Sequence, residues 1–171
     1  MKFFKYILVT QFLIGFNLVS FSQSSIRAIA TAEIIEVLKA AEINSLNFGR
    51  FSPELVGGEI RLTPDGVRTS VGDVALTGGS YNPAAFQVAG QSDATLNIIL
   101  PVGSVVLVNP NTGKTLEVYK WEANPIQNGG TAVLTKGSLL LKVGATLKVG
   151  TFSENPVGKY SGTYTITFSY D

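Results

Sequence analysis

The chain has 171 residues, no cysteine, no histidine, and 13 basic against 12 acidic side chains. The absence of histidine and cysteine removes the usual zinc ligands, the commonest general base and all thiol chemistry, so we expect no metal site, no cofactor and no catalytic triad. A net charge of +1 provides no basic surface of the kind that binds nucleic acid.

The first residues have the layout of a secretory signal peptide. Lys2 and Lys5 form a short basic start, a mainly apolar run follows over residues 7–19, and small side chains come at Ser20 and Ser22. We predict cleavage after Ser22. A retained membrane anchor is the weaker alternative, because the run is shorter than the roughly 20 apolar residues that span a bilayer. We therefore expect an exported protein, in the periplasm, on the cell surface or outside the cell, with no stable membrane span in its mature chain.

Apolar residues alternate where the mature chain, residues 23–171, begins. Ile26, Ala28 and Ala30 fall on one face of an extended segment. A period of two predicts a strand over residues 26–39, although residues 32–41 also fit a short helix. The same alternation suits a segment that pairs with the sheet edge of another chain.

Short strand-like runs separated by turn residues fill the rest of the chain, and no capped helical pattern occurs after residue 45. Four Asn-Pro pairs lie between the runs, and proline interrupts a sheet ladder because it has no N–H. The series predicts an all-β, Ig-like antiparallel β-sandwich, a single domain after the signal peptide. The predicted strands are residues 46–49, 59–63, 73–77, 85–89, 95–100, 104–108, 116–121, 131–134 and 139–149.

The sequence Leu-Lys-Val-Gly occurs twice in the last of these runs, at residues 141–144 and 147–150. The repeat is either the two arms of a hairpin that turns at Gly144 and Ala145 or a coincidence in a region rich in these residues. A single duplication is too little to predict a repeat fold.

The end of the chain, residues 160–171, predicts one uninterrupted strand. Its apolar face carries Tyr164, Ile166, Phe168 and Tyr170, and its other face carries threonine and serine. This alternation is typical of a half-buried strand. We expect these four side chains to belong to a strand that completes the sheet or pairs with a partner.

Three aromatic residues are candidates for a binding surface. Tyr119 and Trp121 share one face of the strand predicted over residues 116–121 and could stack on a sugar or contact a peptide. The alternative is that Trp121 belongs to the core, as tryptophan usually does in β-sandwiches. Tyr81, in a glycine-flanked loop, is a candidate for an exposed contact. These residues define a rival hypothesis, a surface module that binds glycan or peptide.

The polar residues give little support for catalysis. Residues 111–115 end in Gly-Lys-Thr, but Val108 stands where a phosphate-binding loop needs its first glycine, so we predict a hairpin turn. Carboxylates remain, and glycoside hydrolysis needs a facing pair of them. Most of them fall at outward strand positions or in turns, and we expect a protein that is not an enzyme.

Several motifs together resemble a known bacterial family, the domain of unknown function numbered 4402. The motifs are residues 58–66 (GEIRLTPDG), 84–90 (AAFQVAG), 141–150 and 158–164 (GKYSGTY). The resemblance covers nearly the whole mature chain, and it implies a small secreted β-sandwich with no assigned activity.

A broader similarity is to chaperone-usher pilus subunits and spore-coat-U-like domains, whose chains end in an alternating strand. Tyr170 is the penultimate residue here, and Gly158 is fourteenth from the end. This similarity implies a structural or adhesive protein of the cell envelope that assembles by strand addition. Its partners would be like subunits or a periplasmic chaperone, and Ile26, Ala28 and Ala30 would lie in the donated segment.

Overall fold

The computed structural model of the protein describes residues 23–127 and 129–171, and the predicted signal peptide, residues 1–22, lies outside them. The chain divides into two units between Ile34 and Ile35. The described residues of the first unit, 23–34, form neither helix nor strand, and their side chains are exposed. In the described part of the chain, no helix is long and apolar enough to cross a membrane.

The second unit contains ten strands among its described residues, all paired antiparallel, and no helix. The predicted all-β sandwich is therefore confirmed. The strands are β1 (Lys39–Asn44), β2 (Arg50–Leu62), β3 (Arg68–Gly78), β4 (Ala84–Ala89), β5 (Thr95–Ile99), β6 (Val105–Val108), β7 (Thr115–Asn124), β8 (Thr131–Val133), β9 (Ser138–Val149) and β10 (Thr167–Tyr170).

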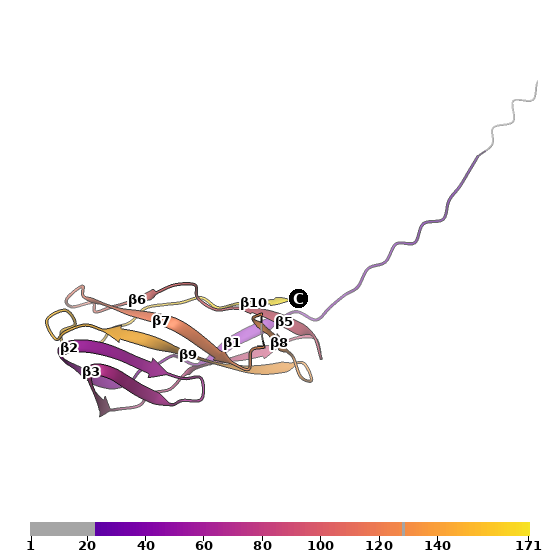
Figure 1. Ribbon diagram of the computed structural model, residues 1–171. Helices are drawn as coiled ribbons and strands as arrows, with labels where there is room; N and C mark the ends of the chain where they lie inside the picture. Colours follow the sequence, from indigo (N-terminus) through magenta and orange to yellow (C-terminus); the bar gives the residue numbers. More distant parts are fainter. Residues whose placement is uncertain (1–22, 128) are drawn as a thin grey trace, which may run out of the picture. The chain divides into compact units, whose positions relative to one another are not determined.

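One long strand, β9, organises the larger sheet, which has seven strands (Figure 1). The first half of β9 pairs with β4 and the second half with β2, while β7 pairs with both halves. Lys142 and Val143 pair with β4 and β7, and Thr146 to Lys148 pair with β2 and β7. Because a strand has only two edges, β4 and β2 share one edge of β9 and β7 occupies the other.

Gly144 lies where β4 and β2 meet along β9. A Cβ atom at this position would lie 2.2 Å from the carbonyl oxygen of Leu62, the last residue of β2. Only glycine permits this approach without a shift of the backbone. The hairpin considered for residues 141–150 is therefore wrong, because β9 continues through Gly144 without a turn.

The smaller sheet has three strands in the order β10-β5-β8. Leu96 and Ile98 of β5 pack against Val88 and Leu141, which belong to β4 and β9 in the larger sheet. A second apolar cluster joins β2, β7 and the second half of β9. Buried and exposed residues alternate over residues 138–142 of β9, and residues 143–147 are all buried. The leucines and valines of β9 contribute to both clusters.

The Asn-Pro pairs lie at strand ends and in loops, as predicted, and two of the asparagines fasten loops to strands. The Asn82 side-chain amide donates to the carbonyl oxygen of Ser45 at 2.6 Å. Asn155 is buried, its amide donates to Thr115 at 2.8 Å, and its oxygen accepts from the Gly150 N–H at 2.6 Å. These bonds satisfy backbone groups at the ends of strands.

Substitution of Leu141 by alanine tests the position of the core. Leu141 is fully buried in β9, so Leu141→Ala should lower the free energy of unfolding by about 2–5 kcal/mol. The neighbouring Leu140 is 43% exposed, and Leu140→Ala should cost less than about 1 kcal/mol. Urea unfolding followed by tryptophan fluorescence measures both, and equal losses would contradict the assigned faces of β9.

Candidate functional site

An open groove runs along one side of the second unit. Its volume is about 460 Å³. One wall comes from β1, with Phe86 of β4 beside it, and the other from the chain that leads into β10. The lining residues are Ala40, Glu42, Ser45, Leu46, Phe86, Gly162, Thr163, Tyr164, Thr165, Ile166 and Phe168.

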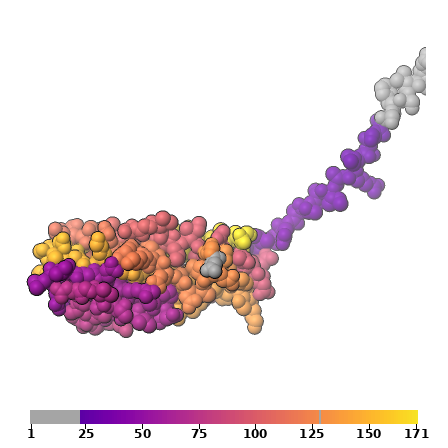
Figure 2. Space-filling model, in the orientation of Figure 1, coloured from indigo at the N-terminus to yellow at the C-terminus, as the bar shows by residue number. Residues whose placement is uncertain are grey.

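The wall at the C-terminal end crosses from one sheet to the other. Ser161 pairs with Val108 at the end of β6, and Gly162 lies so close to β6 that a Cβ there would be 2.3 Å from the Val106 carbonyl oxygen. The chain then joins β5 as β10, whose yellow ribbon and surface atoms mark it in Figures 1 and 2. Among the described residues, no backbone hydrogen bond joins residues 162–166 to another strand.

The predicted strand over residues 160–171 is therefore only partly correct. The ladder is confined to Thr167–Tyr170, because the crossing segment has no neighbouring strand. Its side chains nevertheless alternate as predicted, and the inward ones pack against the apolar cluster of β4, β5 and β9. They are Tyr164, Ile166, Phe168 and Tyr170. Side-chain packing thus holds an extended backbone whose hydrogen-bonding groups have no ladder partner.

The opposite wall is an edge strand. β1 pairs with β4 along one edge and is the terminal strand of the larger sheet, so its other edge faces the groove. The strand predicted over residues 26–39 is wrong, because pairing begins at Lys39. Ile26, Ala28 and Ala30 lie instead in the exposed, extended segment of the first unit, where Ile26 is 92% exposed.

Tyr170 ties the end of the chain to the start of the second unit. Its hydroxyl donates to the Glu36 carbonyl oxygen at 2.8 Å and accepts from the Gln91 N–H at 2.9 Å. Gly90 leaves room for the ring, since a Cβ at that position would lie 2.3 Å from the hydroxyl. The penultimate tyrosine therefore fixes the backbone just before β1.

Gly158 does not line the groove. It packs against the buried side chain of Asn109, where a Cβ would lie 2.3 Å from the amide nitrogen. Asn109 itself closes the β6–β7 turn, which agrees with the hairpin turn predicted for residues 111–115. Gly158 thus has a packing role at the turn, outside the groove.

The structure separates the aromatic residues that the sequence grouped together. Lys120 adopts a positive φ of 48°, and the ladder between β7 and β9 shifts register between Tyr119 and Glu122. This bulge turns Trp121 inward, where it packs against both apolar clusters and lies 4.8 Å from the Tyr164 ring, centroid to centroid. The prediction that Tyr119 and Trp121 share a face is therefore wrong.

The two other aromatics are accessible, each with a charged neighbour. The Tyr119 hydroxyl donates to Glu59, which lowers the pKa of that carboxyl and raises the pKa of Tyr119. Tyr81 is 42% exposed, and the Arg68 guanidinium lies 4.2 Å from the centre of its ring. Tyr81, Tyr119 and Trp121 therefore do not form one flat platform.

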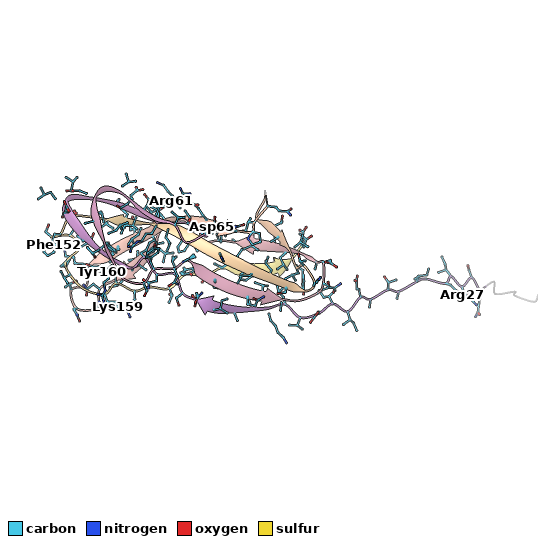
Figure 3. All side chains as sticks on the ribbon, turned by 90° about the horizontal axis from the view of Figure 1, so that it is seen from below. Arg27, Arg61, Asp65, Phe152, Lys159 and Tyr160 are labelled. Atoms are coloured by element: carbon cyan, nitrogen blue, oxygen red, sulfur yellow. The ribbon has the colours of Figure 1, made fainter. Side chains whose placement is uncertain are left out.

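In the part of the chain that the structure describes, two ion pairs lie on the sheet surface outside the groove, Arg61 with Glu122 and Lys120 with Glu59. Arg61 of β2 donates two hydrogen bonds to Glu122 of β7, at 2.8 and 2.7 Å, and Figure 3 shows Arg61 beside the turn that carries Asp65. In the described ranges, no group of three or more carboxylates lies close enough to hold a metal ion. The groove contains one carboxylate, that of Glu42.

Of the eleven lining residues, the sequence analysis named only Tyr164, Ile166 and Phe168 as candidate site residues. The eight that it missed include Ala40 and Glu42 of β1 and Phe86 of β4. The first two lie on alternate positions of β1, within residues 32–41 or just after them, where helix and strand patterns competed. Both faces of this stretch carry apolar and charged residues, so the pattern gave no signal for Ala40 and Glu42.

Comparison with known protein families assigns this chain to one of them. The family described as Domain of unknown function (DUF4402) matches residues 38–170. The chain belongs to this family. The match begins one residue before β1 and ends at the last residue of β10, so the DUF4402 domain contains every described strand and both walls of the groove. None of the curated proteins compared with the chain matches it.

Substitution of Tyr164 by phenylalanine tests whether the buried Tyr164 hydroxyl lacks a hydrogen-bond partner. The Tyr164 hydroxyl is buried without a hydrogen-bond partner among the described residues. Burial, with a smaller contribution from Glu42, raises its pKa to about 12. The unfolded chain loses this proton near pH 10 while the folded chain keeps it, so Tyr164 makes folding less favourable as the pH rises from about 10 to 12.

Tyr164→Phe should therefore leave stability at pH 7 unchanged or raise it by about 1 kcal/mol, and it should weaken the loss of stability above pH 10. Urea unfolding at pH 7, 10 and 11 measures this. Tyr81→Phe is the matched control, because the Tyr81 ring is partly exposed. A loss of more than about 2 kcal/mol at pH 7 would show that the hydroxyl has a partner.

Substitution of Tyr170 tests the contact that fixes the start of β1. Tyr170→Phe removes a donor to Glu36 and an acceptor for Gln91, so it should lower the free energy of unfolding by about 1–3 kcal/mol. Amide hydrogen exchange at Gln91 should become faster as well. Unchanged protection of that amide would contradict the hydrogen bond.

Proposed function

We propose that this protein is an exported, non-enzymatic β-sandwich subunit of structural or adhesive type in the bacterial cell envelope or on its surface, and that it assembles by strand addition. The observation that carries the proposal is the groove between β1 and the crossing segment, residues 162–166. Both walls present backbone groups with no ladder partner among the described residues. An extended segment from a like subunit or a periplasmic chaperone would complete either ladder.

The energetics favour an added strand over an empty groove. Unpaired N–H and C=O groups along a sheet edge are a template for another strand. Each ladder hydrogen bond contributes about 0.5–1.5 kcal/mol, so a segment that pairs with β1 or with the crossing segment gains several kcal/mol. Apolar surface of Leu46, Phe86 and Ile166 would be covered at the same time.

The exposed segment of the first unit provides a donor of suitable composition. Ile26, Ile29 and Ile34 are 92%, 93% and 97% exposed. Isolated apolar side chains are common on protein surfaces, but three isoleucines in a dozen extended residues are an unusual exposed set. Ile26, Ala28 and Ala30 alternate along this segment, as a strand that pairs with a sheet edge requires.

Export is supported by the leader pattern of residues 1–22. The non-enzymatic part of the proposal is supported by the composition, which lacks histidine and cysteine, and by a groove with a single carboxylate. General acid–base chemistry at such a site would need a second titratable group within hydrogen-bond reach.

The rival function, a module that binds glycan or peptide through aromatic rings, has weaker support. Its platform would need coplanar exposed rings, whereas Trp121 packs inward and Tyr119 bonds to Glu59. Tyr81 is exposed but stacks with Arg68. We therefore favour assembly by strand addition.

Deletion of the donor segment tests this function. The full chain, expressed with its own leader and recovered after export, should elute from size-exclusion chromatography as a concentration-dependent series of oligomers. A variant lacking residues 25–34 should be a monomer with the same far-ultraviolet circular dichroism. A wild-type chain that is monomeric at all concentrations, alone and with the periplasmic fraction, would refute the proposal.

A second pair of variants keeps the segment and blocks the groove. Ala40 lines the groove, whereas the adjacent Ala41 does not. Ala40→Trp should therefore prevent oligomers, and the matched control Ala41→Trp should allow them. Both variants should unfold at similar urea concentrations, because both positions are exposed.

A further inference from the structure

The groove contains one charged side chain, Glu42. It lies two residues after Ala40 and four after Leu38, so all three point to the same face of the extended chain. Leu38 packs against the apolar cluster of β4, β5 and β9, which makes this the inner face. Among the described residues, Glu42 has no salt bridge and no side-chain hydrogen bond.

An unpaired inward carboxylate changes which segments the groove can accept. A strand added beside β1 would cover Glu42 and remove water from it. An uncompensated charge in such a position is strongly unfavourable, and inward-pointing charges on edge strands deter indiscriminate pairing. A segment that brings a basic side chain to Glu42 offsets this cost with an ion pair.

The described residues of the first unit contain one basic side chain, Arg27, which is drawn on the extended chain in Figure 3. We propose, on the basis of the strand-addition function above, that Glu42 selects the added segment by charge and that the segment is residues 26–31 of a second copy, with Arg27 against Glu42.

An antiparallel alignment that pairs Arg27 with Glu42 matches the other side chains too. Residues two apart lie on the same face, so Ile29 comes opposite Ala40. The small side chain of Ala40 leaves space in the groove for the larger side chain of Ile29. On the outer face, Ile26 comes opposite Ile43, which is 54% exposed in the free edge strand. The face with Arg27 and Ile29 therefore enters the groove, and Ala28 and Ala30 point outward.

Charge reversal at the two positions tests the pairing in the full exported chain. Glu42→Lys alone and Arg27→Glu alone should each weaken self-association at least tenfold, as measured by sedimentation velocity. The double variant, with both charges reversed, should recover most of the wild-type association. A double variant as weak as the singles would overturn the proposal.

Mixing the two single variants shows whether the contact joins two copies. In the mixture the segment of Arg27→Glu fits the groove of Glu42→Lys, and the segment of Glu42→Lys, which keeps Arg27, fits the groove of Arg27→Glu, which keeps Glu42. An equimolar mixture should therefore form alternating oligomers at concentrations where neither variant associates alone. If the double variant associates but the mixture does not, the pairing lies within one chain and the proposal is wrong.

Aspartate substitutions test the inward face separately. Ile29→Asp should abolish oligomers, and the matched control Ala28→Asp should allow them, while both leave the unfolding midpoint unchanged. The opposite result would overturn the assigned face. If deletion of residues 25–34 abolishes oligomers but no charge reversal affects them, strand addition stands and charge selection by Glu42 is refuted.

Discussion

The architecture depends on one shared strand. β9 carries β4 and β2 end to end on one edge and β7 on the other, so three strands from distant parts of the sequence meet along a single backbone. The arrangement requires Gly144, because any side chain there would collide with the end of β2. Two apolar clusters lie along β9, one with β4 and β5 and the other with β2 and β7.

The open side follows from this arrangement. The half of the larger sheet that contains β4 ends at β1, and the smaller sheet ends at β10, so two edges border the groove. Closed barrels remove their edges, whereas sandwiches must protect them with charges, bulges or covering loops. Here the crossing segment lines one side of the opening with its side chains, and Glu42 is the charge of the edge strand that lies in the groove.

The strand series, the asparagine turns and the fold class could be predicted from the sequence, because alternation and turn chemistry are local properties. Three features were not local. The Leu-Lys-Val-Gly repeat lies in one continuous strand, where Gly144 makes room for the carbonyl oxygen of Leu62 in β2. The bulge at Lys120 turns Trp121 to the opposite face from the one that the alternation predicts. Residues 162–166 have strand-forming side chains but no neighbouring strand. The alternation of apolar and polar side chains shows which face is buried, but it does not show whether another strand lies alongside.

The last of these features connects the fold to its proposed role. A segment rich in threonine and tyrosine would normally find a ladder within its own domain, because an unpaired backbone group costs free energy when water is excluded. The crossing segment remains extended since Tyr164 and Ile166 are held by the core, and Tyr170 holds the chain before β1 at the other wall. Both walls are therefore held by contacts within the domain, and under the proposed function an added segment would lose its own conformational entropy without reordering the groove.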